Sequence, residues 1–186
     1  AINTVSALIR VDSEQARRLL IQLSNFFRAN LQGARTNLIP LMKELMQVEA
    51  YRSLEQARFP DRYQVDISVE EGLEEVLLPP FLIQILLENA FKHAFGSRKT
   101  DNRVWIDVKN SPDGVFISVR DNGEGIDSNH LEKLGKETVP SQEGTGSALE
   151  NLNKRLVSLF GESAKLHFVS SPTGTTVYCT VPYQER

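Results

Sequence analysis

The sequence predicts an α/β (α+β) two-layer sandwich in which helices cover one face of a mixed, mostly antiparallel sheet. Two observations lead to this fold class. Beyond residue 60, alternating stretches typical of strands are separated by helical apolar patterns, and most strands come in pairs joined by turns. Before residue 60, apolar residues recur at helical spacing. The chain therefore divides into a helical segment, residues 1–60, and an α/β domain, residues 61–186.

The helical segment is predicted to form a hairpin of two amphipathic helices. Asp12 is the candidate N-cap of the first helix, with Gln15 three residues on as its capping-box partner, and this helix ends near Gly33. The second helix starts around Pro40 and extends to about Phe59. The apolar stripes of the two helices can pack on the following domain, on a partner chain, or on both.

In the α/β domain, residues 81–95 show the pattern of an amphipathic helix with a wide buried face, and two prolines fit its start. Asn89, Lys92 and His93 share one side of this helix, since residues three and four apart are neighbours. A carbonyl oxygen, an ammonium and an imidazole in one small volume suit a phosphate and its metal ion. The alternative is an ordinary solvated polar face.

The remaining elements follow from alternation and turn chemistry. A further helix is predicted over residues 148–160 because its apolar spacing ends at Gly161. The polar residues 126–143 are interpreted as a long mobile loop. Turns at 111–114 and 172–174 join two pairs of strands. The predicted strands are 63–69, 104–108, 115–119, 165–169 and 175–181.

Composition narrows the function classes. The chain has 186 residues with 40% hydrophobic and 24% charged content, as in ordinary globular proteins. A formal net charge of -3 gives no basic footprint for nucleic acid, and no apolar run approaches the ~20 residues that span a bilayer. The single cysteine, Cys179, excludes an internal disulfide and is interpreted as a buried structural thiol. A reducing, cytoplasmic setting fits these features.

Two glycine motifs are candidate ligand sites. Residues 121–126 (DNGEGI) directly follow a predicted strand, so the Asp121 carboxylate can accept a hydrogen bond from an exocyclic amine. Gly123 and Gly125 let the backbone turn sharply and approach a flat ligand; the alternative is a simple turn. A second motif, residues 144–146 (GTG), opens a helix and offers bare amides to an anion.

The order of these parts resembles the Bergerat (GHKL-type) ATP-binding domain, shared by gyrase B, Hsp90, MutL and histidine kinases. The resemblance covers residues 63–186. Within that superfamily the chain is most similar to LytS/YehU-like sensor histidine kinases, through residues 88–93 (ENAFKH) and through the linking signature within residues 44–59. Residues 3–10 (NTVSALIR) resemble the sequence just after that family's phosphoacceptor motif, HFxFN. The resemblance therefore implies truncation just after the phosphoacceptor histidine.

The resemblance implies a role for each motif residue. Asp121 would read the adenine amine, and Gly123 and Gly125 would shape the adenine pocket. Asn89 would bind the magnesium ion that bridges the phosphates. Other implied contacts are Lys92, His93, Gly144, Thr145 and Gly146 with the phosphates and Thr175 near the adenine.

Two positions leave alternatives open. Glu88 either positions the metal's water or assists proton transfer, as a tentative catalytic residue, or is turned elsewhere by one helix step. Ala148 stands where the branch has a third glycine. If that position needs positive φ, alanine would strain it, and if it is helical, alanine would help. His130 and His167 are interpreted as bystanders.

By resemblance, the chain is expected to be the ATP-binding catalytic domain of a two-component sensor histidine kinase. It would use ATP and Mg2+ to phosphorylate a histidine and then a response regulator, with a LytTR-type regulator implied. The full protein would be a homodimer and a membrane-anchored sensor, anchored by regions outside this chain, with this domain in the cytoplasm and no direct contact to nucleic acid. We expect the chain to bind Mg-ATP without phosphorylating itself.

Two rival functions are compatible with the same motifs. The first is a GHKL-type ATPase clamp, in which a catalytic glutamate stands one helical turn before the metal-binding asparagine. Ile85 occupies that place, which argues against hydrolysis. The second is a non-catalytic nucleotide-binding dimerisation module, which Ala148 modestly supports.

Overall fold

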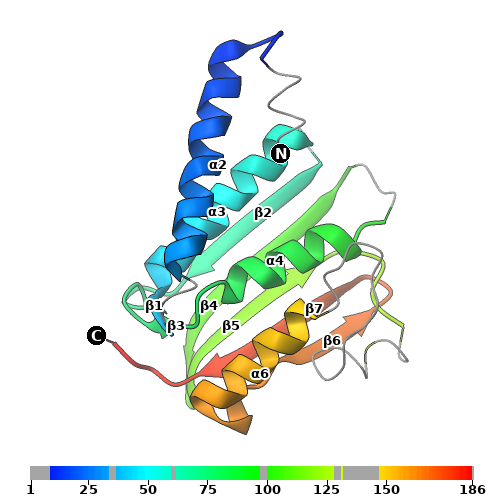
Figure 1. Ribbon diagram of the computed structural model, residues 1–186. Coiled ribbons are helices and arrows are strands. Elements are labelled where there is room, and N and C mark those ends of the chain that lie inside the picture. The colour runs from blue at the N-terminus through cyan, green and yellow to red at the C-terminus, as the bar shows by residue number, and fades with distance from the viewer. Residues whose placement is uncertain are drawn as a thin grey trace.

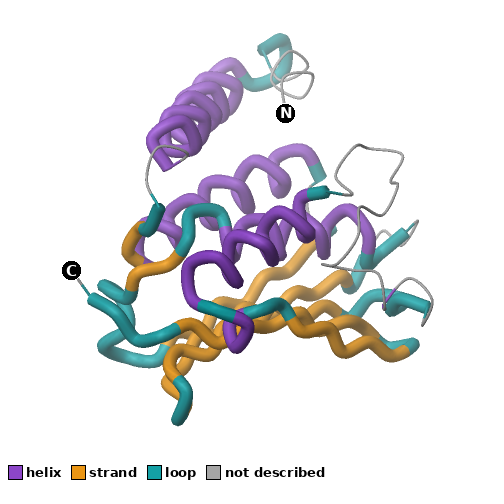
Figure 2. Tube along the Cα trace, turned by 60° about the horizontal axis from the view of Figure 1, so that its bottom comes forward, coloured by secondary structure: helices purple, strands orange, loops and turns teal. Residues whose placement is uncertain are grey.

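The computed structural model describes residues 9–33, 37–59, 62–96, 100–127, 131 and 147–185. Its helices lie on one face of a five-stranded sheet, so the domain has two layers (Figures 1 and 2). The predicted α/β sandwich is therefore confirmed. The helices are α2 (Ser13–Gly33), α3 (Leu41–Arg58), α4 (Leu82–His93) and α6 (Ala148–Phe160).

The sheet has the strand order β2-β4-β5-β7-β6. Strand β2 pairs parallel with β4, and the other neighbours are antiparallel. Both predicted hairpins are confirmed, with closing pairs Ser111–Gly114 and Ser171–Gly174. The strands are β2 (Tyr63–Val69), β4 (Asn102–Ser111), β5 (Gly114–Asp121), β6 (His167–Ser171) and β7 (Gly174–Val181).

The structure adds elements that the sequence patterns did not predict. A small antiparallel sheet joins β1 (Ile39–Pro40) to β3 (Leu77–Leu78), and a 3-10 helix spans Glu162–Ala164. Strands of two residues are too short to show alternation, so no sequence pattern marks them. The strand predicted over 165–169 instead spans His167–Ser171.

The main core lies between the sheet and helices α3, α4 and α6, with Leu41 and Val48 contributed by α3. Alternate residues of β4 and β5, such as Ile106 and Ile117, point inward and are fully buried. Cys179 of β7 is also fully buried, as predicted, and burial raises its thiol pKa to about 12. This thiol is therefore structural.

Helix α2 packs on α3 and extends away from the sheet (Figure 2). Its N-terminus is capped as predicted, because the Asp12 Oδ1 atom accepts a hydrogen bond from the Gln15 N–H at 2.9 Å. Within the described residues, no helix combines the length and apolar composition needed to cross a bilayer. The α2–α3 contact is a separate small core of Ala16, Leu19, Leu23 and Leu54.

Helix α3 is joined to the α/β domain by a buried carboxylate. Glu44 has no exposed surface, and its two oxygens accept hydrogen bonds from the backbone N–H groups of Phe81, Ile83 and Gln84 at 2.8, 2.9 and 3.1 Å. Burial raises the pKa of Glu44 from 4.5 to about 7, against the opposing effects of these N–H groups and of Arg155. The residue thus titrates in the neutral range.

This raised pKa predicts a pH dependence of stability. Because the folded protein binds the Glu44 proton more tightly than the unfolded chain does, the stabilisation is complete below pH 4.5 and is lost as the pH rises through about 7. We expect urea unfolding to show a steeper fall of the unfolding free energy across this window in the wild type than in Glu44→Gln. Arg155 stays charged throughout, and other titrating groups are common to both proteins. If the unfolding free energies of the wild type and Glu44→Gln changed with pH in parallel, the raised pKa of Glu44 would be contradicted.

Candidate functional site

Helix α4 carries the first group of predicted site residues. One side of the helix is buried in the core through Leu86, Leu87 and Phe91. The other side carries the polar residues Glu88, Asn89, Lys92 and His93. The Lys92 ammonium contacts the Glu88 carboxylate at 2.9 Å, one helical turn away. The helix therefore fixes these four side chains relative to the sheet.

Asp121 ends strand β5 and is held by two backbone donors. Its Oδ1 atom accepts hydrogen bonds from the N–H groups of Gly123 at 2.8 Å and Thr175 at 3.1 Å. The residue is 8% exposed. The carboxylate thus connects its own loop with the start of β7 and is fixed in orientation.

The glycines around Asp121 stand where the chain approaches itself. A Cβ atom on Gly123 would lie 2.1 Å from the Ala94 carbonyl oxygen at the end of α4, and one on Gly125 would lie 2.0 Å from the Ser171 carbonyl oxygen. The Glu124 N–H also donates to the Ala94 oxygen at 2.9 Å. Side chains at these two glycines would push the loop away from α4 and from the β6–β7 turn.

A small cavity of about 30 Å³ lies where α4, β5, β7 and this loop meet. Its apolar walls surround a few polar groups, which is the usual composition of a small-molecule site. Five predicted site residues from separate parts of the chain meet here. The cavity is lined by Asn89, His93, Asp121, Gly125 and Thr175, together with Leu86, Ala90, Ala94, Val119, Ile126 and Val177.

A second cavity, of about 20 Å³, shares Asn89 with the first. Its other lining residues include Glu88, Lys92 and Ile85 of α4 and Ala148 of α6. Glu88 therefore faces the same space as Asn89 and Lys92. Ala148 is the first residue of helix α6 and has no positive φ. The helical alternative for Ala148 is thus the correct one, and alanine causes no strain there.

Some predicted site residues lie outside the described part of the chain. These are Gly144, Thr145 and Gly146. His130, interpreted as a bystander, and most of the polar stretch 126–143 also lie outside the described part. Their predicted roles remain predictions. His167 lies on β6 and stacks on the ring of Tyr178 at 5.1 Å, in keeping with its interpretation as a bystander.

Two residues with no role expected from the sequence support the site: Ser170, which stands in no motif, and Asn122, which stands within the 121–126 motif. The Ser170 hydroxyl accepts a hydrogen bond from the Ile126 N–H at 2.8 Å and lies 2.9 Å from the Thr175 hydroxyl. Asn122 holds the start of β4 through the Arg103 N–H at 2.8 Å. Only the fold brings Ser170 beside the 121–126 motif, so no local spacing could have identified it.

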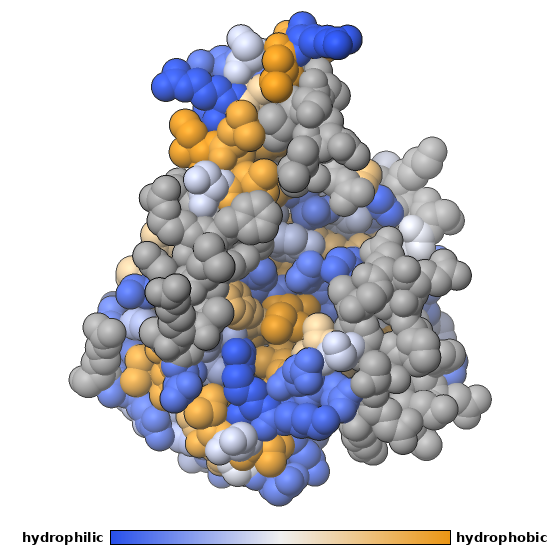
Figure 3. All heavy atoms as spheres, in the orientation of Figure 1, coloured by the Kyte–Doolittle hydropathy of each residue, from blue (hydrophilic) through white to orange (hydrophobic). Residues whose placement is uncertain are grey.

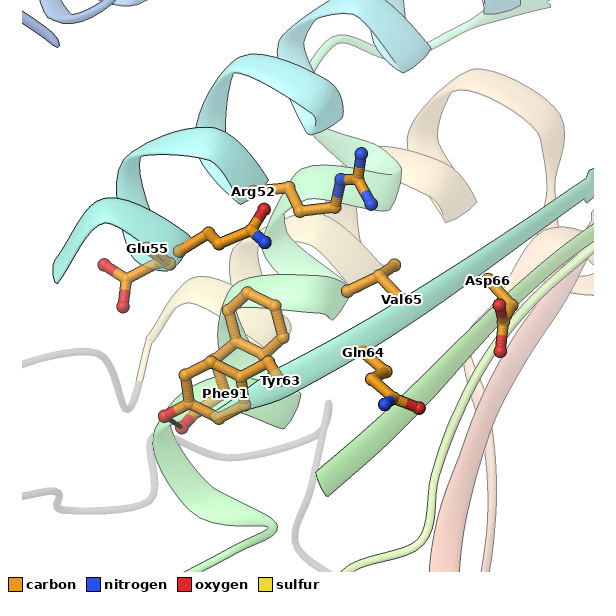
Figure 4. A pocket seen from close by; sticks show the side chains of 8 residues that line it. Arg52, Glu55, Tyr63, Gln64, Val65, Asp66 and Phe91 are labelled. Carbon is orange, nitrogen blue, oxygen red and sulfur yellow. Dashed lines mark hydrogen bonds between the residues drawn. The ribbon is translucent and has the colours of Figure 1, made fainter. Parts of the chain in front are cut away.

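A larger cavity, of about 280 Å³, lies between α3 and β2 and contains none of the predicted site residues (Figure 4). Its lining includes Arg52 and Glu55 of α3 and Tyr63 of β2. Phe91, on the buried side of α4, stacks on Tyr63 at 4.3 Å. This cavity is therefore separate from the one at Asn89.

Comparisons with known proteins agree with this geometry. The family described as histidine kinase-, DNA gyrase B-, and HSP90-like ATPase matches residues 80–185, and the family described as histidine kinase matches residues 1–63. Sensor protein LytS of Staphylococcus epidermidis (strain ATCC 35984) is 56% identical over 184 residues, which are 99% of this chain and 31% of that protein. Sensor histidine kinase/phosphatase LytS of Staphylococcus aureus (strain Mu50) is 55% identical over 187 residues, 100% of this chain and 32% of that protein. The chain spans about a third of the length of these relatives.

Solved structures show the same fold at low sequence identity. The histidine kinase domain from the Erythrobacter litoralis EL346 blue-light activated histidine kinase has a TM-score of 0.56 and 20% identity, covering 95% of this chain and 85% of that chain. The catalytic domain of histidine kinase ThkA has a TM-score of 0.61 and 16% identity, and the match covers 78% of this chain and 94% of that chain. The chain belongs to the histidine kinase-, DNA gyrase B-, and HSP90-like ATPase family, and it is a LytS-like histidine kinase catalytic region.

Proposed function

We propose that this chain binds Mg-ATP and acts as the ATP-binding catalytic domain of a sensor histidine kinase. One observation carries the proposal: Asn89, His93, Asp121 and Thr175 line one cavity although the sequence separates them widely. In the whole protein, the γ-phosphate would pass to a histidine and then to a response regulator, for which we propose the LytTR type.

The adenine would bind at the cavity beside Asp121, and the cavity walls would have to move apart to admit the base, because about 30 Å³ is on the order of the volume of one water molecule. A carboxylate has about four acceptor positions. The Asp121 Oδ1 atom accepts hydrogen bonds from the N–H groups of Gly123 and Thr175. The same carboxylate can accept a further hydrogen bond from the exocyclic amine. Val119 and Val177 supply apolar surface for the ring faces. This combination distinguishes adenine from a base that presents a carbonyl oxygen at that position.

The phosphates would lie on the Asn89 side, toward the second cavity. Magnesium prefers hard oxygen ligands and is usually held by few protein groups together with phosphates and water. The Asn89 carboxamide and Glu88 carboxylate oxygens fit this preference, since both residues line the second cavity. The bound ion would neutralise phosphate charge. Lys92 and His93 would face the phosphates from the same helix side, with Gly144, Thr145 and Gly146 proposed at the opposite edge.

In this arrangement the chain acts by positioning and charge neutralisation, which dominate catalysis of phosphoryl transfer. Asp121 anchors the base while the α4 residues align the triphosphate. Glu88 would orient a water molecule on the metal or receive a proton. Its contact with Lys92 keeps it turned toward the site.

The helical segment, residues 1–60, is proposed to belong to the dimerisation and phosphoacceptor region, with the catalytic domain over 61–186. Helix α2 carries exposed apolar side chains, including Leu20 at 48% and Ile21 at 50%, and hydrophobic spheres gather over it in Figure 3. Such a surface favours a homodimer of the whole protein. A membrane anchor would be supplied by regions outside this chain.

The ATPase-clamp alternative is disfavoured by Ile85. This residue lies one helical turn before Asn89 and lines the second cavity, where a clamp would place its catalytic glutamate. An isoleucine cannot activate water. The non-catalytic module loses its support from Ala148, because that residue begins a helix without strain.

Calorimetric titration tests the proposed site. We expect the wild type to bind ATP, with higher affinity when Mg2+ is present. Asn89→Ala should lose most of this Mg2+ enhancement, a several-fold effect, because the carboxamide ligand is removed. Asn151→Ala is the matched control, since Asn151 is an exposed asparagine on helix α6. Equal Mg2+ enhancement in wild type and Asn89→Ala would remove Asn89 from the metal site.

Phosphotransfer is tested on a longer chain that also carries the proposed phosphoacceptor histidine. With γ-labelled ATP, a histidine kinase should acquire acid-labile label, whereas a clamp should release labelled phosphate into solution. Binding without either product would favour the non-catalytic module.

A further inference from the structure

Helix α4 has no N-terminal cap of its own. The residue at its N-cap position, Phe81, is in the left-handed region with φ 69° and provides no side-chain hydrogen bond. The first amides of any helix lack partners within it. Here the Phe81, Ile83 and Gln84 amides donate to Glu44, which lies on α3. The first turn of α4 therefore depends on another helix.

The two helices are joined at a second point. Seven residues beyond Glu44, the ring of Tyr51 stacks on Phe91 near the other end of α4, with ring centroids 5.9 Å apart. Glu44 and Tyr51 thus hold both ends of α4 from one element. Asn89 lies between these attachment points, on the side of α4 that faces the proposed nucleotide site.

A third element meets the same turn. Arg155 of α6 donates a hydrogen bond to the Pro80 carbonyl oxygen, and it is the charged group whose attraction lowers the Glu44 pKa. Helix α6 begins at Ala148, which lines the second cavity beside Glu88 and Asn89. The start of α4 is therefore a junction of α3, α4 and α6.

We propose that Glu44 is a positioning residue that locks α4 to α3, so that a shift of α3 moves Asn89 and changes the affinity for Mg-ATP. This inference rests on the proposed function and adds a route by which the helical segment controls the nucleotide site. Glu44 lines neither of the two cavities at Asn89 and acts through the backbone of α4.

The hydrogen bonds of Glu44 favour two arrangements of α3 and α4, one with the helices joined and one with them separated. A buried carboxylate is stable only while it is fully hydrogen-bonded, and bonds to a charged acceptor are the stronger kind. If α3 moved away, Glu44 and the three α4 amides would lose their hydrogen-bond partners. Arrangements in which α3 and α4 are only partly separated are therefore disfavoured. Helix α3 therefore either holds the first turn of α4 or releases it entirely.

The test uses Glu44→Gln, which keeps the size of the side chain but replaces one of the two acceptor oxygens with an NH2 donor that cannot bind the α4 amides. Glu49→Gln is the matched control, because Glu49 lies on the exposed side of α3 and bonds Arg52. We expect Glu44→Gln to raise the Kd for Mg-ATP about fivefold at a temperature where both variants are folded, a loss comparable to the net contribution of one ordinary hydrogen bond. Amide exchange at Ile83 and Gln84 should also accelerate at least tenfold, and Glu49→Gln should change neither quantity.

The outcomes separate the possible failures. If Glu44→Gln lowers the melting temperature and leaves the Kd unchanged, Glu44 is a structural cap only and the proposal is overturned. If the wild type itself fails to bind Mg-ATP, the proposed function fails first, while the exchange measurement still shows whether Glu44 locks α4. If Glu44→Gln does not fold, Glu44→Asp replaces it as the test, because aspartate keeps the carboxylate but has a shorter side chain. A raised Kd for Mg-ATP in Glu44→Asp supports the proposal, and an unchanged Kd overturns it.

Discussion

Replacing Asp121 with asparagine is expected to weaken Mg-ATP binding at least tenfold, about 1.4 kcal/mol of binding free energy. The carboxylate oxygen Oδ1 accepts the Gly123 and Thr175 N–H groups, and the amide oxygen of asparagine can accept both. The substitution therefore preserves the loop. It turns the other end of the side chain from an acceptor into a donor, which would face the adenine amine, also a donor.

Calorimetry on folded protein measures this effect, with thermal unfolding recorded in parallel. Asp66→Asn is the control, because it also replaces an aspartate with asparagine but at an exposed position on strand β2. Its affinity for Mg-ATP should equal that of the wild type. An unchanged affinity in Asp121→Asn would remove Asp121 from the nucleotide site, whereas a large fall in melting temperature would show that the carboxylate charge is needed for the fold.

Local patterns allowed most of the fold to be predicted. Helix α4 shows in the spacing of its apolar residues, and the two hairpins show in turn residues such as Gly114 and Gly174. The Glu44 junction could not be predicted, because its bonds join residues 37 to 40 positions apart and depend on how α3 docks. A glutamate on a helix otherwise has the pattern of a solvated surface residue.

The candidate site was predictable only where a motif marks it. Asn89 and Asp121 stand in recognisable motifs, and the structure brings both to one cavity. Ser170 stands in no motif, although its hydroxyl binds the Ile126 N–H. The sequence could not decide whether alanine is strained at position 148, because the conformation required there depends on where α6 begins. Helix starts are the boundaries that sequence patterns fix least well.

Gly125→Ala is expected to reduce the unfolding free energy by about 3 kcal/mol, against about 1 kcal/mol for Gly72→Ala. Both glycines have a φ angle in the left-handed region, +74° and +87°, where alanine is strained whatever space surrounds it. They differ in surroundings, because the added Cβ would lie 2.0 Å from the Ser171 oxygen at Gly125, and nothing lies within 4 Å at Gly72. Urea unfolding without nucleotide measures both losses, and equal losses would contradict the steric argument.

The surroundings of Gly123 and Gly125 also explain why the 121–126 motif contains glycine. The sequence suggested that Gly123 and Gly125 leave room for a flat ligand, yet the space a side chain would take is filled by the carbonyl oxygens of Ala94 and Ser171. The glycines therefore let the loop pack against α4 and the β6–β7 turn, and this packing forms the cavity wall at Gly125. Their loss should thus destabilise the protein before any nucleotide is added, and the loss of Mg-ATP affinity in Gly125→Ala should follow from the displaced loop. Gly72→Ala, far from the cavity lining, should bind Mg-ATP as the wild type does.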